Sequence, residues 1–536
     1  MRPFERQKRR KKKKGKDQRG QVFHEESSPL FHDLQKNLNK IREELGHSTD
    51  LVVREFEWDG ERKIRFAAVY IDGLVDNNMV GDFIMKSLML ESRDDRQTIS
   101  RKTAFDRVQE NGLAVGEVKI TRDWNGLILS ILCGETVILM DGWDEAISCG
   151  TKGGEKRPID EPTSQVVIRG PRDSFTESIR TNTALVRRRV KSPNLWLETM
   201  RIGKVTQTDV SLMYIKGIVD EKIVREVKNR LERIQIDSIL ESGYIEEMIR
   251  DSAFSLFPTL YMTERPDVIA GNLLEGRVAI LVDGTPFALV VPALLNQFFQ
   301  TTEDYYQNYW ISGFLRFVRY GAFLLSLLTP SLYIAATTFH HAMIPTTFLI
   351  TLVAQREGIP FPAFVEALIM ELMFEILREA GIRLPRPVGQ AVSIVGAIVL
   401  GEAAVRAGLV SPAMVIVVAI TAIASFSAPS YNLAITARLL RFLFMLVGAS
   451  FGLFGIALLL IVVLAHLSSL RSFGVPYLSP LAPFVFSDQK DTVFRFPWWS
   501  LITRPRLISQ KNMTRMEKDL RPSPPDKPTE GEGNEK

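Results

Sequence analysis

Apolar residues in the second half of the chain form long runs that contain no Asp, Glu, Lys or Arg. The three longest are residues 320–355, 407–437 and 442–467, with 36, 31 and 26 residues. A helix needs ~20 mostly apolar residues to cross a bilayer, because no backbone N–H or C=O can stay unpaired in hydrocarbon. A buried helix of a soluble protein explains one such run poorly and several in succession worse. The pattern therefore predicts a helical transmembrane domain over residues 311–470.

Basic residues flank this domain on both sides. Eleven of residues 1–20 are Lys or Arg, and no apolar segment follows them, which excludes a signal peptide. This stretch is predicted to be a disordered tail that is attracted to an anionic membrane leaflet. Residues 471–536 are also rich in Arg and Lys, and short basic flanks favour the cytosolic side. Two cytosolic ends require an even number of spans, and we expect four: 320–339, 388–408, 411–428 and 441–467.

The soluble half contains an internal repeat. Residues 68–76, AVYIDGLVD, match residues 212–220, LMYIKGIVD, and ILMDG at 138–142 matches ILVDG at 280–284. Two landmarks with nearly the same offset indicate a duplication. Each copy has the pattern of a strand, a Gly turn, a helix and a later strand whose Asp-Gly predicts a hairpin turn. In the second copy, apolar residues fall on one helical face, at Ile223, Val227, Leu231 and Ile234.

The sequence thus predicts a fold of class α/β plus all-α membrane: a cytosolic N-terminal region of two related α/β subdomains, followed by a multi-span helical transmembrane domain. The expected parts are a basic disordered tail (1–30), subdomain 1 (31–160), a basic helical connector (161–204), subdomain 2 (205–310), the transmembrane domain (311–470) and a cytosolic C-terminal tail (471–536).

The connector carries a run of positive charge and is expected to form a helix after Pro171. Such a run is by default a solvated face. Here it alternates with apolar residues such as Phe175 and Leu185, which suggests that part of it packs on a subdomain or on a neighbouring subunit. The candidate contact residues are Arg169, Arg172, Arg187, Arg188 and Arg189.

Composition and motifs argue against an enzyme. The two cysteines, Cys133 and Cys149, exclude a disulfide framework and multi-cysteine metal or iron–sulfur sites. The sequence has no phosphate-binding GxxxxGK[ST] loop, no HExxH and no GxSxG. A net charge of +5 on 536 residues gives no support for nucleic acid binding. We therefore expect no catalytic residues, no cofactor and no metal.

One predicted membrane-domain helix, within residues 360–387, carries carboxylates among apolar residues. Glu371 and Glu375 lie one turn apart on the same face. Ionisable residues inside a membrane are costly and are therefore functional candidates. An interfacial helix, a re-entrant element and the wall of a water-filled pore all remain open. Pairing of Glu375 with Arg378, and of Glu379 with Arg383, would instead make the stripe structural.

In a closed oligomer, one carboxylate per subunit becomes a ring that favours cations. The candidate pore-lining residues are Glu371, Glu375 and Glu366. Glu366 lies ~140° around the helix from Glu371, so both cannot line one narrow path. Glu402 and Arg406, at i and i+4, form a candidate intramembrane ion pair.

Long motifs resemble a known family, the A subunits of nutrient germinant receptors of endospore-forming bacteria, the GerA (GerABKA) family. The resemblance runs from about residue 30 to residue 484. It is carried by motifs such as VIRGPRDSFTESIRTNTALVRRR (167–189), TERPDVIAGNLLEGRVAILVDGTPF (263–287), TFHHAMIPTTFL (338–349) and LRSFGVPYLSPLAPF (470–484). His341 stands where an acidic residue is expected, and Glu402 where Gln is usual.

The resemblance implies a two-part cytosolic N-terminal domain and a multi-span membrane domain in the inner spore membrane. It also implies assembly with a transporter-like B subunit and a lipoprotein C subunit. A subunits of this family are thought to oligomerise into a nutrient-gated channel that releases monovalent cations. Two alternatives remain: a non-conducting scaffold or signalling subunit for a transporter-like sensor, and a secondary transporter, which inverted repeats within 313–470 would support.

Overall fold

The computed structural model describes residues 28–58, 64–81, 105, 117–153, 161–162, 165, 167–384, 401–517 and 520–523. The basic stretch 1–27 and most of the expected span 388–408 therefore lie outside the described residues. The chain divides into two compact units. The first comprises Met1–Ile41, Val53–Tyr70 and Asn78–Thr151, and the second comprises Arg42–Val52, Ile71–Asn77 and Lys152–Lys536.

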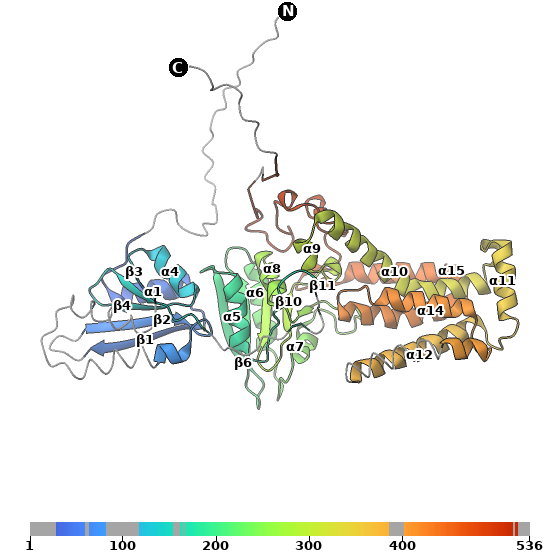
Figure 1. Ribbon diagram of the computed structural model, residues 1–536, viewed down its shortest axis with the longest axis horizontal. Helices are drawn as coiled ribbons and strands as arrows, with labels where there is room; N and C mark the ends of the chain where they lie inside the picture. The colour runs from blue at the N-terminus through green and yellow to red at the C-terminus, as the bar shows by residue number, and fades with distance from the viewer. Residues whose placement is uncertain are drawn as a thin grey trace, which may run out of the picture. The chain divides into compact units, whose positions relative to one another are not determined.

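A five-stranded sheet organises the first unit (Figure 1). Its strand order is β1-β2-β4-β5-β3. The strands are β1 (Leu51–Trp58), β2 (Ile64–Ile71), β3 (Val118–Thr121), β4 (Thr136–Met140) and β5 (Ala146–Cys149), and the helices include α1 (Leu34–Glu44) and α4 (Trp124–Leu132). Asp123 caps α4, since its side chain accepts the N–H of Gly126 at 2.8 Å. Phe66, Ile138 and Cys149 belong to the core.

A second sheet with the same strand order, β6-β7-β9-β10-β8, lies in the second unit. Its elements are α5 (Ile179–Arg189), β6 (Leu195–Ile202), β7 (Thr208–Ile215), α6 (Glu221–Glu232), α7 (Ser242–Ile249), β8 (Tyr261–Thr263), α8 (Pro266–Leu274), β9 (Val278–Val282), β10 (Ala288–Val291) and η3 (Leu295–Phe299). Alternate residues of β7 enter different cores: Leu212 packs with α6 and α7, and Met213 packs with α5 and α8. Helices therefore cover both faces of this sheet.

The predicted repeat falls on equivalent strands of the two sheets. The first landmark ends β2 and β7, and the ILxDG landmark covers β4 and β9. Both Asp-Gly pairs lie in the hairpin turns between antiparallel strands, as predicted, with φ of +79° at Gly142 and +88° at Gly284. The strands pair antiparallel, so both units are α+β in type, and the term α/β holds only in the loose sense of mixed helices and strands.

The helical part of the second unit contains α9 (Glu303–Tyr306), α10 (Tyr309–Thr338), η4 (His341–Met343), α11 (Thr346–Arg356), α12 (Ala363–Arg383), α14 (Pro412–Ser425) and α15 (Tyr431–Ser469). Among the described residues, α10 and α15 are long and apolar enough to cross a membrane, and α14 is a shorter apolar helix of 14 residues. Helix α12 has 21 residues, or about 32 Å, which also matches the bilayer core. Helix α12 carries more charged residues than α14 or α15.

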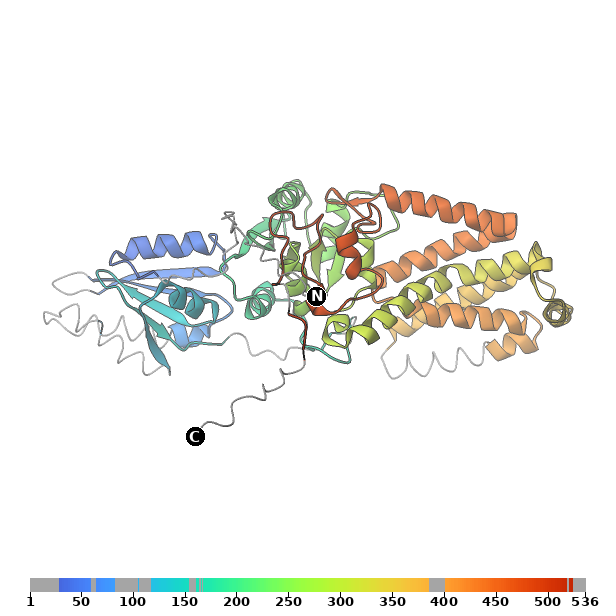
Figure 2. The same ribbon diagram turned by 90° about the horizontal axis from the view of Figure 1, so that it is seen from above.

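Helix α15 is two antiparallel legs rather than one span. Its backbone leaves the helical region at Gly452, where φ is +62° and ψ is −148°. Thr436 donates to the backbone O of Leu256 at 2.6 Å, and His466 Nε2 lies 3.1 Å from Ser255 Oγ. A straight helix would separate Thr436 and His466 by about 45 Å. The chain therefore reverses at Gly452, and Figure 2 shows the two legs meeting at the end of the bundle away from the sheet.

This reversal corrects the expectation of a single span over 441–467. The legs, 431–451 and 453–469, run side by side, and the tip at Gly452 contacts Phe339 and His340, at the end of α10. A run of 26 apolar residues is compatible with one crossing or with a hairpin. Glycine at position 452 permits the hairpin, because a residue with a Cβ would be strained at this φ.

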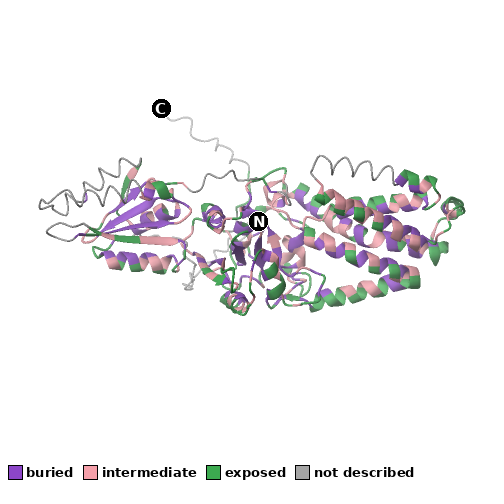
Figure 3. Ribbon diagram, turned by 90° about the horizontal axis from the view of Figure 1, so that it is seen from below, coloured by how far each residue is buried: buried purple, intermediate pink, exposed green. Residues whose placement is uncertain are grey.

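The helical domain begins and ends on the same side. Arg316, in the second turn of α10, contacts Asp491 of the C-terminal segment, and His466, near the end of α15, contacts Ser255 of the sheet region. Many residues of these helices are exposed (Figure 3), and apolar side chains are among them, such as Phe454 at 73% and Ile461 at 62% exposed. Such a surface suits lipid and marks a membrane domain.

The segment after α15 folds back onto the second sheet. It contains the hairpin β11 (Arg471–Ser472) and β12 (Val475–Pro476), then η5 (Phe486–Lys490) and η6 (Trp498–Ser500). Ser472 Oγ donates to the backbone O of Thr259 at 2.6 Å and accepts the N–H of Ala293 at 2.9 Å. Ser509 Oγ donates to the backbone O of Ile218 at 2.8 Å. Much of the stretch that the sequence assigns to a tail is thus part of the folded unit.

Replacing Gly452 with valine should destabilise the helical hairpin. A Cβ at this position would lie 2.8 Å from His340 Cε1, and the positive φ adds about 1–3 kcal/mol of strain. We expect a lower thermal unfolding temperature in detergent and less protein in membranes. Gly321→Ala is the matched control, because nothing lies within 4 Å of its added Cβ on α10. Equal behaviour of the two variants would contradict the tight turn.

The two cysteines should differ in reactivity. Burial, with a smaller contribution from Glu135, raises the pKa of Cys149 to about 12. Cys149 therefore stays a protonated, shielded thiol at pH 8, whereas Cys133 is partly exposed. Mass spectrometry after maleimide treatment at pH 8 should find one label on the native chain and two after unfolding. A native Cys133→Ser chain that still takes a label would contradict this assignment.

Candidate functional site

The carboxylates of α12 pair with arginines in the first leg of α15. Glu371 Oε2 lies 2.5 Å from Arg441 Nη1, and Glu375 Oε2 lies 3.1 Å from Arg438 Nη1. One turn forward on α12 corresponds to one turn backward on α15, so the helices run antiparallel and the pairs form a ladder. Arg441 also donates from Nε to the backbone O of Ser326 at 2.7 Å, which ties α10 to the same point.

The Glu371–Arg441 pair of the ladder is shielded from solvent, and the Glu375–Arg438 pair is partly exposed. Glu371 and Arg441 side chains are 0% and 1% exposed. Arg378, which also pairs with Glu375 at 3.2 Å, stacks over Phe374 and donates to Ser425 of α14 at 3.0 Å. Charges in such a setting persist only when they are paired and hydrogen-bonded. The ladder therefore fixes the relative positions of α10, α12, α14 and α15.

Glu366 occupies a separate position from this ladder. Its Oε1 lies 3.1 Å from Arg356 Nη2 of α11, and its Oε2 accepts the N–H of Ser411 at 2.9 Å, where α14 begins. Its side chain is 0% exposed. The helical angle between Glu366 and Glu371 thus sends them to different partners. Both carboxylates face arginine rather than water in this single chain.

The remaining predicted ion pairs lie at the surface. Arg383 lies 2.7 Å from Glu379, and Arg406 lies 2.6 Å from Glu402, with all four side chains well exposed. Neither pair joins the buried ladder. At such exposure, each contributes little to stability.

The basic connector divides into buried and exposed parts. Arg187 is 1% exposed and binds Asp50 through Nε and Nη2, with a further bond to the backbone O of Leu195 at 3.2 Å. Arg189 pairs with Asp173, and Arg188 donates to the backbone O of Gly153 at 2.8 Å.

The other two connector arginines lie outside this packed part. Arg172 pairs with Glu161 at 3.2 Å, and Arg169 is exposed. A role of these arginines in contacts between subunits stays a prediction. The connector helix begins at Ile179 rather than just after Pro171, because Phe175 and Glu177 form backbone bonds with Glu264 and Gly284.

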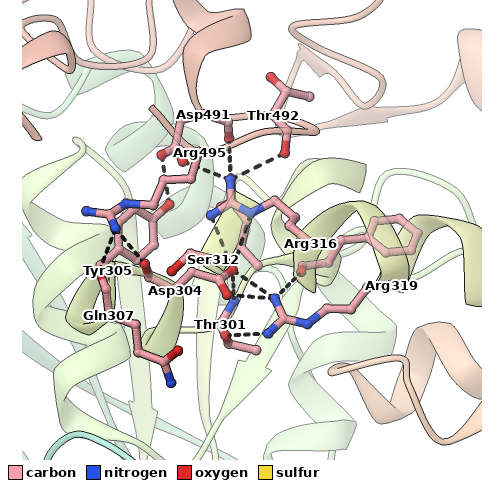
Figure 4. Close-up of polar contacts among 12 residues, drawn as sticks. Thr301, Asp304, Tyr305, Gln307, Ser312, Arg316, Arg319, Asp491, Thr492 and Arg495 are labelled. Atoms are coloured by element: carbon pink, nitrogen blue, oxygen red, sulfur yellow. Dashed lines mark hydrogen bonds and ion pairs between the residues drawn. The ribbon is translucent and has the colours of Figure 1, made fainter. Parts of the chain in front are cut away.

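A second buried ionic cluster lies where the sheet meets the helices (Figure 4). We call it the junction cluster; it consists of Asp304, Arg316, Arg319, Asp491 and Arg495. Asp304 accepts from Arg316 at 3.2 Å and from Arg319 at 2.8 Å. Arg316 reaches Asp491 at 2.8 Å, and Arg495 donates to the backbone O of Asp304 at 2.8 Å.

The junction cluster joins three segments, two of them adjacent in sequence and the third more than 170 residues later. They are the linker before α10, the first turns of α10 and the C-terminal segment. Burial raises the pKa of Asp491, although the Arg316 charge acts in the opposite direction. Tyr305 donates to Asp491 at 2.7 Å, and burial together with this carboxylate raises the pKa of Tyr305. The tyrosine thus remains a donor at neutral pH.

Sequence reasoning found the carboxylates and the Glu375–Arg378 pair, which the structure confirms, but missed the partners on α15. Arg438 and Arg441 lie between two apolar runs at a spacing of three, which matches the spacing of four between Glu371 and Glu375 on an antiparallel helix. That complementary spacing was the available signal. Among the described residues, no group of three or more His, Cys, Asp or Glu side chains could hold a metal ion.

Replacing Asp304 with asparagine should destabilise the junction cluster. The change leaves Arg316 buried beside a neutral side chain, and losing one partner of a buried pair costs about 3–5 kcal/mol. Thermal unfolding of the purified chain in detergent measures this. Glu303→Gln, one residue earlier and without an arginine partner in the described part of the chain, is the control. Matching stabilities of the two variants would argue that Asp304 does not hold the cluster.

Comparison with known proteins finds a family and several relatives for this chain. The family described as Bacillus/Clostridium GerA spore germination protein matches residues 39–507. Spore germination protein KA of Bacillus subtilis is 53% identical over 92% of this chain and 89% of its own length. GerLA of Bacillus cereus is 40% identical over 90% of this chain and 97% of its own length.

A further sequence relative and one solved structure also match this chain. The uncharacterized membrane protein YfkQ of Bacillus subtilis is 43% identical over 90% of this chain and 93% of its own length. The crystal structure of the N-terminal domain of the A subunit of the Bacillus megaterium spore germinant receptor GerK3 is 44% identical. It covers 50% of this chain and 98% of that chain, with a TM-score of 0.40. Since the family match spans most of the chain, this membrane protein belongs to the GerA family of spore germination receptor A subunits, a receptor family without enzymatic activity.

Proposed function

We propose that the chain forms the ion channel of a nutrient germinant receptor and releases monovalent cations when a nutrient is sensed. Copies of the A subunit assemble into a closed oligomer, with a transporter-like B subunit and a lipoprotein C subunit as partners. Family membership and the apolar outer faces of the helices support this function. The observation that carries it is the ladder of Glu371–Arg441, which is fully buried, and Glu375–Arg438 inside the helical domain.

The ladder gives the helical domain a switchable element. Buried charges exchange partners between discrete arrangements, because an intermediate with an unpaired charge is costly. In the single chain, arginines neutralise the carboxylates that the sequence places at an ion path. We propose that these pairs hold the closed arrangement, and that opening frees Glu371 and Glu375 to face a hydrated path. Glu366 keeps its pair with Arg356 and anchors the start of α14.

The junction cluster connects this element to the sheet domain. A rearrangement of the sheet domain or of a partner would act on Arg316 and Arg319, and through them on α10. Because Arg441 binds the backbone of Ser326 on α10, a shift of α10 would act on the ladder. A nutrient favours the open arrangement only by its differential affinity for the two states.

We place the receptor in the inner spore membrane with its N-terminal domain in the cytosol. The start of α10 and the end of α15 adjoin the same sheet domain, which fits an even number of crossings. Residues 1–20 would add electrostatic attraction to the anionic leaflet on that side.

Charge exchange within the ladder tests the gating role. The assembled receptor in a planar bilayer should pass monovalent cations when the nutrient is added. Glu371→Gln and Arg441→Gln should both raise the conductance without nutrient. The increase is about tenfold for each 1.4 kcal/mol by which the variant destabilises the closed arrangement relative to the open one. The double exchange Glu371→Arg with Arg441→Glu should restore the low resting conductance, because the pair is present again.

Glu379→Gln is the matched control, since Glu379 lies on the same helix in an exposed pair. If Glu371→Gln changes cation selectivity while Arg441→Gln is silent, Glu371 lines the path and the gating role is wrong. If the receptor passes no current although nutrient binds, the chain is instead a non-conducting scaffold or signalling subunit.

A further inference from the structure

A large cleft lies where the second leg of α15 ends. Its volume is about 870 Å³, and its walls are α6, α7 and the hairpin that follows α15. The side chains that line it include Arg230, Arg233, Arg250, His466 and Arg471. The hairpin turn is tight, because Phe473 and Gly474 have φ of +49° and +82°.

The cleft carries an excess of positive charge. Its lining has four arginines against two carboxylates, Glu226 and Asp251. Both carboxylates pair with the same arginine, Arg230, whose guanidinium also stacks over Phe473 at 4.4 Å. The two carboxylates of the lining are therefore already engaged. Of the other three arginines, Arg250 interacts electrostatically with Glu246, whereas Arg233 and Arg471 form no ion pair within the described part of the chain.

These three arginines have donors to offer. Within the described part of the chain, neither Arg233 nor Arg471 has an ion-pair partner, and the buried Nε of Arg250 has no hydrogen-bond partner. Arg250 uses Nη2 for the backbone O of Ala253 at 2.5 Å, which fixes the side chain. Guanidinium groups that converge on a cleft suit a phosphate, because their donors match its oxygens.

The position of the cleft indicates where the phosphate comes from. Val462, His466 and Ser469 share one face of α15, at spacings of four and three. His466 and Ser469 line the cleft, and Val462, one turn toward the membrane, is 55% exposed. A molecule in the cleft can thus extend its apolar part along the lipid-facing surface of α15. The cleft lies at the end of the second leg of α15, beside the sheet domain.

We propose that this cleft binds the phosphate headgroup of an anionic phospholipid, with Arg233, Arg250 and Arg471 as the recognising residues. Basic pockets beside membrane helices on the cytosolic side are a general form of headgroup recognition. The headgroup bridges α6–α7 of the sheet domain and the end of α15. A bound lipid therefore strengthens the connection between the sheet domain and the helical domain, at a point other than the junction cluster.

Lipid binding by the full-length chain in neutral detergent tests this site. Binding of a short-chain phosphatidylglycerol is measured by native mass spectrometry and by the rise in unfolding temperature. The Arg233→Gln/Arg471→Gln double variant should bind it more weakly, by about fivefold for each arginine. Lys222→Gln/Arg225→Gln removes the same charge from the first two turns of α6, outside the cleft lining, and should bind like the parent.

Phosphatidylcholine, glycerol phosphate and inorganic phosphate complete the experiment. We expect none of them to compete at the concentration that saturates phosphatidylglycerol. Equal loss of binding in the two double variants would mean general electrostatic attraction and would overturn the site. Competition by glycerol phosphate or inorganic phosphate at that concentration would assign the cleft to a soluble anion instead. Unchanged binding by the cleft variant, with unchanged thermal stability, would also reject it.

Discussion

The helical domain depends on one constraint, which is that charges buried among apolar helices must find partners. Glu371 and Arg441 are both fully shielded, and each would be strongly destabilising alone. Their pairing, with that of Glu375 and Arg438, sets the register and the antiparallel direction of α12 and α15. The hydrophobic effect cannot set them, because lipid is as apolar as a leucine side chain. The charged helix that looks least suited to a membrane is thus the one that orders the bundle.

The sequence predicts features whose information is local. The duplication follows from matching landmarks, and the hairpins follow from Asp-Gly, whose glycine provides a positive φ. The face of α6 follows from apolar spacing, with Ile223, Val227 and Leu231 all buried. Ile234 lies beyond the end of α6, since helix ends depend on contacts that periodicity does not contain.

Features that depend on distant partners could not be predicted in this way. The apolar run around Gly452 has the same composition whether the chain goes straight or reverses, and the contact with His340 settles it. The C-terminal segment shows no periodicity, and its order comes from single bonds such as that of Ser472 to Thr259, 213 residues away. The arginines of the ladder and of the junction cluster pair with residues of other segments, and the folding of the chain brings these partners together.

The Glu371–Arg441 pair of the ladder is shielded but not fully satisfied. Within the part of the chain that the structure describes, Glu371 Oε1 and Arg441 Nη2 have no hydrogen-bond partner, although both are buried. Each unmade bond costs about 1–3 kcal/mol. This conformation is therefore less stable than a fully bonded pair would be. An arrangement that supplies the missing partners, from water or from a neighbouring subunit, recovers that energy. The free-energy difference between the two arrangements is then small enough for one ligand to reverse, if it binds one arrangement more tightly than the other. A pair with all its hydrogen bonds made would resist this rearrangement. The missing bonds therefore favour a pair that can rearrange over one that only holds the helices in place.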